Sequence, residues 1–171
     1  MRSRFLFLGW FLLPLALSAA DLRPVVQREA VKCAATWQRN DYEGILAYLP
    51  PRLLQRAGGK SAALRELQDQ FAEARKLGVQ SMEARPGPPT APRLIGPWLV
   101  SIVPLTAVLH GPHLDLTQTT HALALSADKG KHWSFVLLYQ VTQAQLEKWF
   151  PELAGKVTVP NDPVPSLDVV L

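Results

Sequence analysis

Asp115 and His121 are the residues of this chain whose types and spacing come closest to an acid–base pair. They lie six positions apart in a segment of predicted strand, so both fall on the same strand face. An imidazole beside a carboxylate titrates near neutral pH and could move a proton. The same face also carries Thr117 and Thr119, which are ordinary strand residues. The pattern therefore favours a solvated face over a catalytic dyad, and no catalytic residue is assigned.

Two further histidines could in principle bind a metal ion. His110 and His113 flank a Gly-Pro turn, but a metal site needs further ligands and none can be identified. No nucleotide-binding loop, serine nucleophile elbow or zinc motif occurs in the chain. The sequence therefore predicts no metal and no cofactor.

Cys33 is the one cysteine of the chain, so it cannot form an internal disulfide. It falls on the apolar side of a helical pattern, which favours a buried and inert thiol. An intermolecular disulfide is the alternative. A catalytic thiol would need a basic neighbour, and none is adjacent.

Helical periodicity dominates the first half of the chain. Apolar residues recur at helical spacing over residues 24–39 and 61–77, and two short helical segments lie between these helices. Asp41 is the predicted cap of the first short segment, and Ser61 is the predicted N-cap of the second long helix. Gly78 fits the position just after that helix ends.

Strand patterns dominate the second half, and a short helix follows them. Four mostly antiparallel strands are predicted, over residues 79–85, 98–110, 114–126 and 132–140. Pro104 cannot donate to a strand ladder, so it is expected at a sheet edge or a bulge. Thr142 and Gln145 form the capping box of the final helix. Helices segregated from strands indicate an α+β fold.

The segment from Ser126 to Trp133 has the pattern S-x-D-x-G-x-x-W. Asp128 supplies local hydrogen bonds and Gly130 a positive φ, so the segment is predicted to be a tight hairpin. The pattern resembles the Asp-box of sialidase-like propellers, where it recurs once per blade. One copy in a chain of this length cannot build a propeller, so we interpret it as a structural turn. His132 is expected to be exposed on this hairpin.

The chain resembles the cone-shaped nuclear transport factor two-like superfamily over about residues 25–160. The matching segments are Asn40-Asp41-Tyr42-Glu43, Gly58-Gly59-Lys60, Ile102-Val103-Pro104 and the hairpin. Residues 146–160 are similar to the end of exported bacterial members without an assigned activity. The resemblance implies helices packed on a strongly curved, four-stranded, mostly antiparallel sheet with a short C-terminal helix.

The same resemblance implies an apolar-walled cavity between the sheet and the helices. Candidates to line it are Trp37, Tyr42, Phe71, Trp98 and Tyr139. Ordinary core packing is the alternative for the aromatic residues, and it is the interpretation favoured for the tryptophans and Phe71. Enzymes on this scaffold place an Asp or a His–Asp pair in the cavity, but their motif positions do not match residue by residue here.

Residues 1–20 have the order of a signal peptide. Arg2 and Arg4 precede an apolar run of about 13 residues, and small residues follow at positions 18–20. The run is shorter than the roughly 20 residues that span a bilayer. We therefore expect export to the periplasm or beyond, with cleavage near Ala20, a single domain over residues 21–160 and an extended tail over 161–171.

Size, charge and motifs leave several function classes open. The formal charge of +4 includes both leader arginines, and the remaining basic residues are scattered, which argues against a nucleic-acid partner. We expect an exported, non-catalytic domain that binds a small apolar ligand or an envelope protein, with no transmembrane segment in the mature chain. The alternative is a small isomerase, dehydratase or hydrolase that uses Asp115 and His121. A structural role and a homodimer also stay open.

Overall fold

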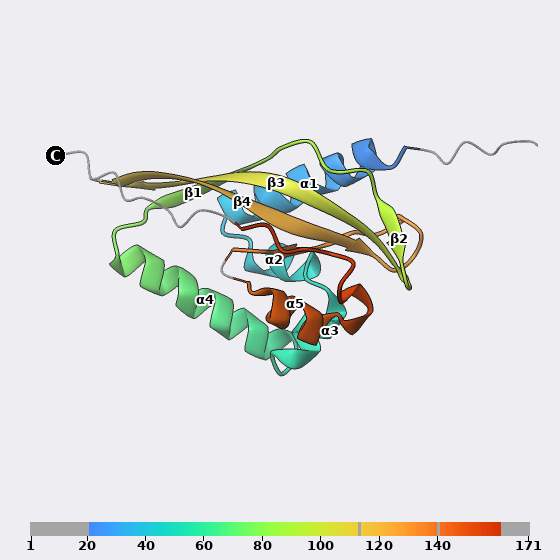
Figure 1. The fold of residues 1–171 in the computed structure, drawn as a ribbon. Helices are drawn as coiled ribbons and strands as arrows, with labels where there is room; N and C mark the ends of the chain where they lie inside the picture. The colour runs from blue at the N-terminus through green and yellow to red at the C-terminus, as the bar shows by residue number, and fades with distance from the viewer. Residues whose placement is uncertain (1–20, 113, 140, 162–171) are drawn as a thin grey trace, which may run out of the picture.

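The computed structural model describes residues 21–112, 114–139 and 141–161, with the backbone alone at positions 114 and 115. The helices are α1 (Arg23–Gln38), α2 (Tyr42–Ala47), α3 (Pro51–Arg56), α4 (Lys60–Lys76), α5 (Gln143–Trp149) and the short 3₁₀ helix η1 (Pro151–Leu153). The strands are β1 (Ser81–Pro86), β2 (Arg93–Ile95), β3 (Trp98–Gly111), β4 (Leu114–Ser126) and β5 (Ser134–Leu137). Figure 1 shows the long β3–β4 ribbon crossing the molecule, with α4 and α5 on one side of it.

The sheet is antiparallel and has the order β1-β3-β4-β5, with β2 paired to the first residues of β3. The β3–β4 ladder runs without interruption from Leu99 opposite Ser126 to Gly111 opposite Leu114. The predicted α+β fold, with helices on a strongly curved antiparallel sheet and a short C-terminal helix, is confirmed. The three-residue strand β2 was not predicted.

Pro104 corrects one sequence-based prediction. It was expected at an edge or bulge, yet it lies in β3, a central strand, opposite His121. β1 ends opposite Leu105 and β2 begins opposite Val100, so the strand pairing is interrupted beside Pro104. The Pro104 carbonyl accepts a hydrogen bond from Gly87 N on that side (2.8 Å). Because the missing N–H faces this interruption, the proline costs the β3–β4 ladder nothing.

Both faces of β4 are buried near the hairpin. Ala122 and Ala124 pack against Val26 of α1, together with the hairpin aromatics. The alternate residues Leu123 and Leu125 belong to a second cluster around α5 that contains Phe150. Successive strand residues point to opposite faces, so α1 and α5 cover opposite sides of the same strand.

Most helix ends lie where the capping residues of the sequence predicted them. Asp41 Oδ1 accepts from Gly44 N (2.9 Å) at the start of α2, and Thr142 and Gln145 form the predicted capping box. Gly78 has a φ of +95° directly after α4. The predicted cap at Ser61 is wrong, because α4 begins at Lys60 with Gly59 as its N-cap. The positive φ of Gly59 (94°) starts the helix earlier than a side-chain cap would.

Over residues 21–112, 114–139 and 141–161, no helix is both long and apolar enough to cross a bilayer.

Candidate functional site

A pocket of about 360 Å³ lies between α4, the C-terminal end of α1 and the strands β1 and β3. The chain reverses after α4, so that β1 returns over the C-terminal half of that helix (Figure 1). Pockets that bind small molecules occupy roughly 300–1,000 Å³. The volume is therefore sufficient for a small organic ligand.

The pocket has an apolar wall and a polar rim. Its apolar lining residues are all half-buried: Trp37, Phe71, Ala74, Val79, Met82, Leu109 and Tyr139. Its polar lining residues are all exposed: Asn40, Gln70, Arg75, Gln80 and Ser81. A concave apolar wall that the described residues leave open is the usual form of a small-molecule site.

Aromatic packing holds the wall in place. The rings of Trp37 and Phe71 stack with centroids 5.8 Å apart and planes at 25°. Tyr42 meets Phe71 edge to face, at 5.2 Å. The tight turn at Asn40, with a φ of +52°, brings the end of α1 and the start of α2 into contact with the same ring. The predicted helix break therefore positions the pocket aromatics.

Arg75 is the one charged residue of the pocket lining in the described part of the chain. Its Nη2 donates a hydrogen bond to the hydroxyl of Tyr42 (3.3 Å). The described lining contains no Asp, Glu, His or Cys. The rim therefore offers hydrogen-bond donors and one positive charge, and no group with the pKa of a general base near neutral pH.

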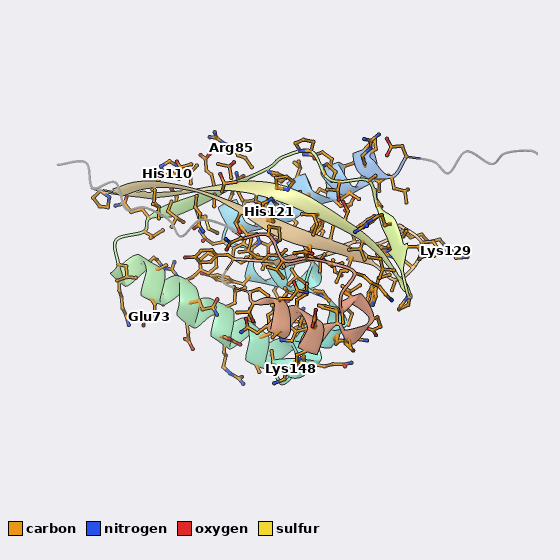
Figure 2. The ribbon with its side chains drawn as sticks, in the orientation of Figure 1. Glu73, Arg85, His110, His121, Lys129 and Lys148 are labelled. Carbon is orange, nitrogen blue, oxygen red and sulfur yellow. The ribbon has the colours of Figure 1, made fainter. Side chains whose placement is uncertain are left out.

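Strand alternation separates the pocket from the charged residues of β1 and β3. Met82 and Leu109 are opposed in the β1–β3 register and both line the pocket. Their neighbours Glu83 and His110 lie on the other face, with Glu83 Oε1 and His110 Nε2 4.0 Å apart. Figure 2 shows Arg85 and His110 on the side of the sheet away from α4. Arg85 Nη2 pairs with Glu83 Oε2 at 2.6 Å.

The backbone of β4 sets the separation between the two residues of the alternative acid–base pair. Asp115 and His121 both belong to β4, an uninterrupted strand. Six residues of extended chain separate their Cα atoms by about 20 Å, which no side chains of these lengths can bridge. Asp115 lies opposite His110 at one end of the ribbon, whereas His121 lies opposite Pro104 near its middle. His121 is half-buried and does not line the pocket.

The five cavity candidates fall into three positions. Trp37, Phe71 and Tyr139 line the pocket, and Tyr42 packs behind Phe71. Trp98 lies elsewhere, edge to face with Phe150 at 6.0 Å in the cluster around α5. The wall formed by β1 and β3 was not predicted from the sequence. The sequence feature that pointed toward this wall was the predicted strand after Gly78, but a strand pattern does not reveal which helix the strand packs on.

Other reactive residues stay apart from the pocket. Within the described ranges, no three His, Cys, Asp or Glu residues are grouped closely enough to hold a metal ion, and His113 lies outside those ranges. Cys33 is half-buried and packs against the cluster that contains Val26 and Ala122, and burial raises the pKa of its thiol to about 12. The thiol is therefore protonated at neutral pH and unreactive.

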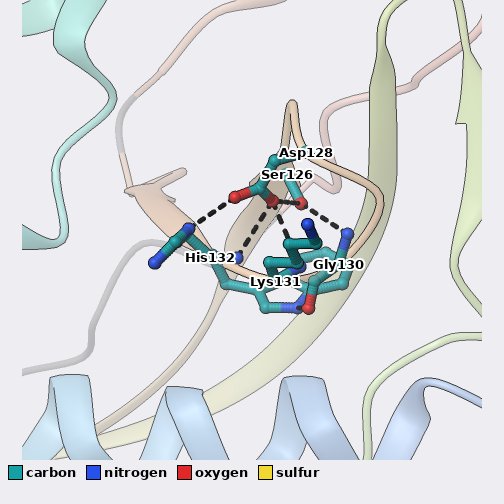
Figure 3. A network of polar contacts seen from close by, with 6 residues as sticks. Ser126, Asp128, Gly130, Lys131 and His132 are labelled. Carbon is teal, nitrogen blue, oxygen red and sulfur yellow. Dashed lines mark hydrogen bonds and ion pairs between the residues drawn. The ribbon is translucent and has the colours of Figure 1, made fainter.

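The hairpin is a closed hydrogen-bond network (Figure 3). Asp128 Oδ1 accepts from the Ser126 hydroxyl and from the backbone N–H groups of residues 131 and 132, at 2.8–3.1 Å. The backbone N–H and side chain of His132, followed by the Ser126 hydroxyl, hold the pKa of Asp128 well below its usual range. Gly130 has a φ of +89° and its N–H donates to Ser126 Oγ. The side chains of Ser126 and Asp128 are both used within the turn, which supports a structural role.

No protein-family model matches the chain. Among curated proteins, no significant match is found. No solved structure is significantly similar to it. Evidence for function therefore has to come from the geometry of the pocket.

Proposed function

We propose that this domain is a non-catalytic binding module whose pocket beside α4 holds a small, mainly apolar ligand. The observation that carries the proposal is the half-buried apolar wall, which is concave and lies inside a rim of exposed polar residues. Covering such a wall with a ligand removes apolar surface from water, at a gain of roughly 25 cal/mol per Å².

The pocket chemistry supports binding over catalysis. An enzyme of the isomerase, dehydratase or hydrolase type needs a group that can take up or release a proton at the reacting atom. The described pocket lining supplies Arg75, Ser81 and the Tyr139 hydroxyl, with no carboxylate or imidazole. The 20-Å spacing estimated for Asp115 and His121 from strand rise also argues against a shared proton.

We also propose that the domain acts after export and belongs to the nuclear transport factor two-like superfamily. The support is the residue order of positions 1–20 and the motifs quoted above. Export predicts that protein recovered outside the cytoplasm begins near Asp21, as N-terminal sequencing or intact mass would show. Cytosolic protein with Met1 still in place would contradict it.

Titration with the neutral fluorescent dye Nile red tests the binding function. We expect saturable binding at one site, because the pocket of about 360 Å³ has a half-buried apolar wall that the dye can cover. Ala74→Trp places an indole into the pocket and should weaken dye binding at least tenfold. Ala74 is half-buried at the pocket wall, so the larger side chain can be accommodated by filling the open space.

Leu94→Ala is the matched control. Leu94 is 73% exposed on β2 and does not line the pocket, so it reports dye that merely adheres to surface leucines. Equal binding by the wild type and Ala74→Trp, or a loss caused by Leu94→Ala instead, would overturn the proposed function. Circular dichroism of each variant confirms that the fold is retained.

A further inference from the structure

We propose that the ligand is an amphipathic carboxylate, with its apolar tail against Phe71 and Met82 and its carboxylate on Arg75. This inference rests on the proposed function, because it names the ligand class for the same pocket. It follows from the charge of the rim and from the way in which Arg75 is held.

The positive charge of Arg75 is not matched by an acidic group of the pocket. No Asp or Glu occurs in the described lining. Glu73 pairs with Lys76 at 2.7 Å, and Figure 2 shows Glu73 on the side of α4 that faces away from the sheet. Glu83 lies on the opposite sheet face and pairs with Arg85. Among the described lining residues, no carboxylate would therefore compete with a ligand anion for Arg75.

Hydrogen bonding orients the guanidinium and leaves it capacity for a ligand. Arg75 lies in the last turn of α4, where a basic residue also complements the helix dipole. Its bond to the Tyr42 hydroxyl holds one end of the exposed guanidinium beside the ring that contacts Phe71. A guanidinium has five N–H donors, and a carboxylate accepts two of them in parallel. Arg75 uses one of these donors on Tyr42.

The dimensions of the pocket suit a ligand of this kind. Apolar residues form the wall, including Trp37 on one side and Leu109 of β3, and the charged residue Arg75 lies at the exposed rim. A hydrocarbon tail can thus be buried while the carboxylate stays at the solvent boundary, where its desolvation cost is small. A fully polar ligand would leave the wall unused, and a cation would meet Arg75 with like charge.

Displacement of Nile red by three matched amphiphiles tests the inference. Decanoate, decanol and decylamine share one tail and differ in charge, and each is used at neutral pH below its micellar concentration. We expect decanoate to displace the dye at about five- to tenfold lower concentration than decanol, and decylamine to be weakest. Added salt should narrow the difference, because the Arg75 side chain is exposed.

Variants locate the charge effect. Arg75→Gln should weaken decanoate about five- to tenfold and leave decanol unchanged, whereas Arg75→Lys should recover part of the decanoate affinity. Arg65→Gln is the control, since Arg65 is exposed on the same helix but does not line the pocket.

Two results would overturn the inference and leave the binding function standing. Decanol or decylamine binding as well as decanoate would do so, and so would an unchanged decanoate affinity in Arg75→Gln. Failure of all three amphiphiles to displace the dye would also reject it. Dye binding that does not depend on Ala74 would instead reject the proposed function itself.

Discussion

Arg52 and Glu152 form a two-pronged ion pair across 100 residues of sequence, with N–O distances of 2.9 and 2.8 Å. The pair joins α3 to η1, the short helix that follows α5. Arg52 Nη1 also donates to the Trp149 carbonyl at 3.1 Å, and the guanidinium lies 5.6 Å from the Phe150 ring centroid. Arg52 therefore links the C-terminal elements to the helical half of the molecule, in addition to the packing of Leu53 against the cluster around α5.

Arg52→Ala should lower the free energy of unfolding by about 1–2 kcal/mol, because it removes charge-assisted bonds and a cation–π contact from a half-exposed site. Arg52→Lys should recover less than half of this, since an ammonium cannot form the parallel pair. Urea unfolding followed by tryptophan fluorescence measures both. A decrease in unfolding free energy below about 0.3 kcal/mol for Arg52→Ala would show that the pair does not stabilise the contact between α3 and η1.

The same pair should make stability depend on acid pH. Hydrogen bonding to Arg52 lowers the pKa of Glu152 to about 2. A carboxyl group with a depressed pKa stabilises the fold at pH values above its unfolded-state pKa, near 4.3. This stabilisation is lost as the pH falls toward the folded-state pKa. The difference in stability between wild type and Arg52→Ala should therefore shrink between about pH 4.5 and pH 2. A difference that is constant over this range would contradict the assignment.

Gly130→Val should destabilise the hairpin. Gly130 has a φ of +89°, and a Cβ there would meet Leu22 Cδ1 at 3.1 Å. Backbone strain and crowding together should cost about 1 kcal/mol or more. Ala127→Val, at an exposed position of the same turn, is the control and should stay within about 0.5 kcal/mol. An unchanged melting temperature for Gly130→Val would count against the turn geometry.

Asp115 and His121 should behave as independent residues. Because about 20 Å of strand separates them, a double-mutant cycle of Asp115→Asn and His121→Gln should give a coupling energy below about 0.5 kcal/mol. The cycle is measured on unfolding free energy and on Nile red affinity. A coupling above 1 kcal/mol in either quantity would restore the acid–base hypothesis.

Local chemistry made much of the fold predictable. Asp41, Gly78, Thr142 and Gly130 each act through neighbours within a few residues, and the structure places all four as expected. Pro104 and Ser61 were placed wrongly for different reasons, one distant in sequence and one local. The outcome at Pro104 depends on where β1 and β2 end, and the start of α4 depends on the backbone of Gly59.

The pocket was predictable only in part. Trp37 and Phe71 were candidates because the resemblance implied an apolar-walled cavity. Met82 and Leu109 could not be found from sequence, since they reach the pocket through a strand register and the path of the chain after α4. The even spacing of Asp115 and His121 indicated a shared strand face, but six residues of extended strand also place their Cα atoms about 20 Å apart.

Amide chemical-shift mapping with Nile red tests the central claim most directly. In a ¹⁵N-labelled protein, saturating dye should shift the amides of Gln80, Ser81 and Leu109 and those in the C-terminal half of α4, because these groups surround the pocket. Amides of β2, next to the exposed Leu94, should stay unchanged. Shifts confined to β2, or spread evenly over the molecule, would contradict a ligand pocket beside α4.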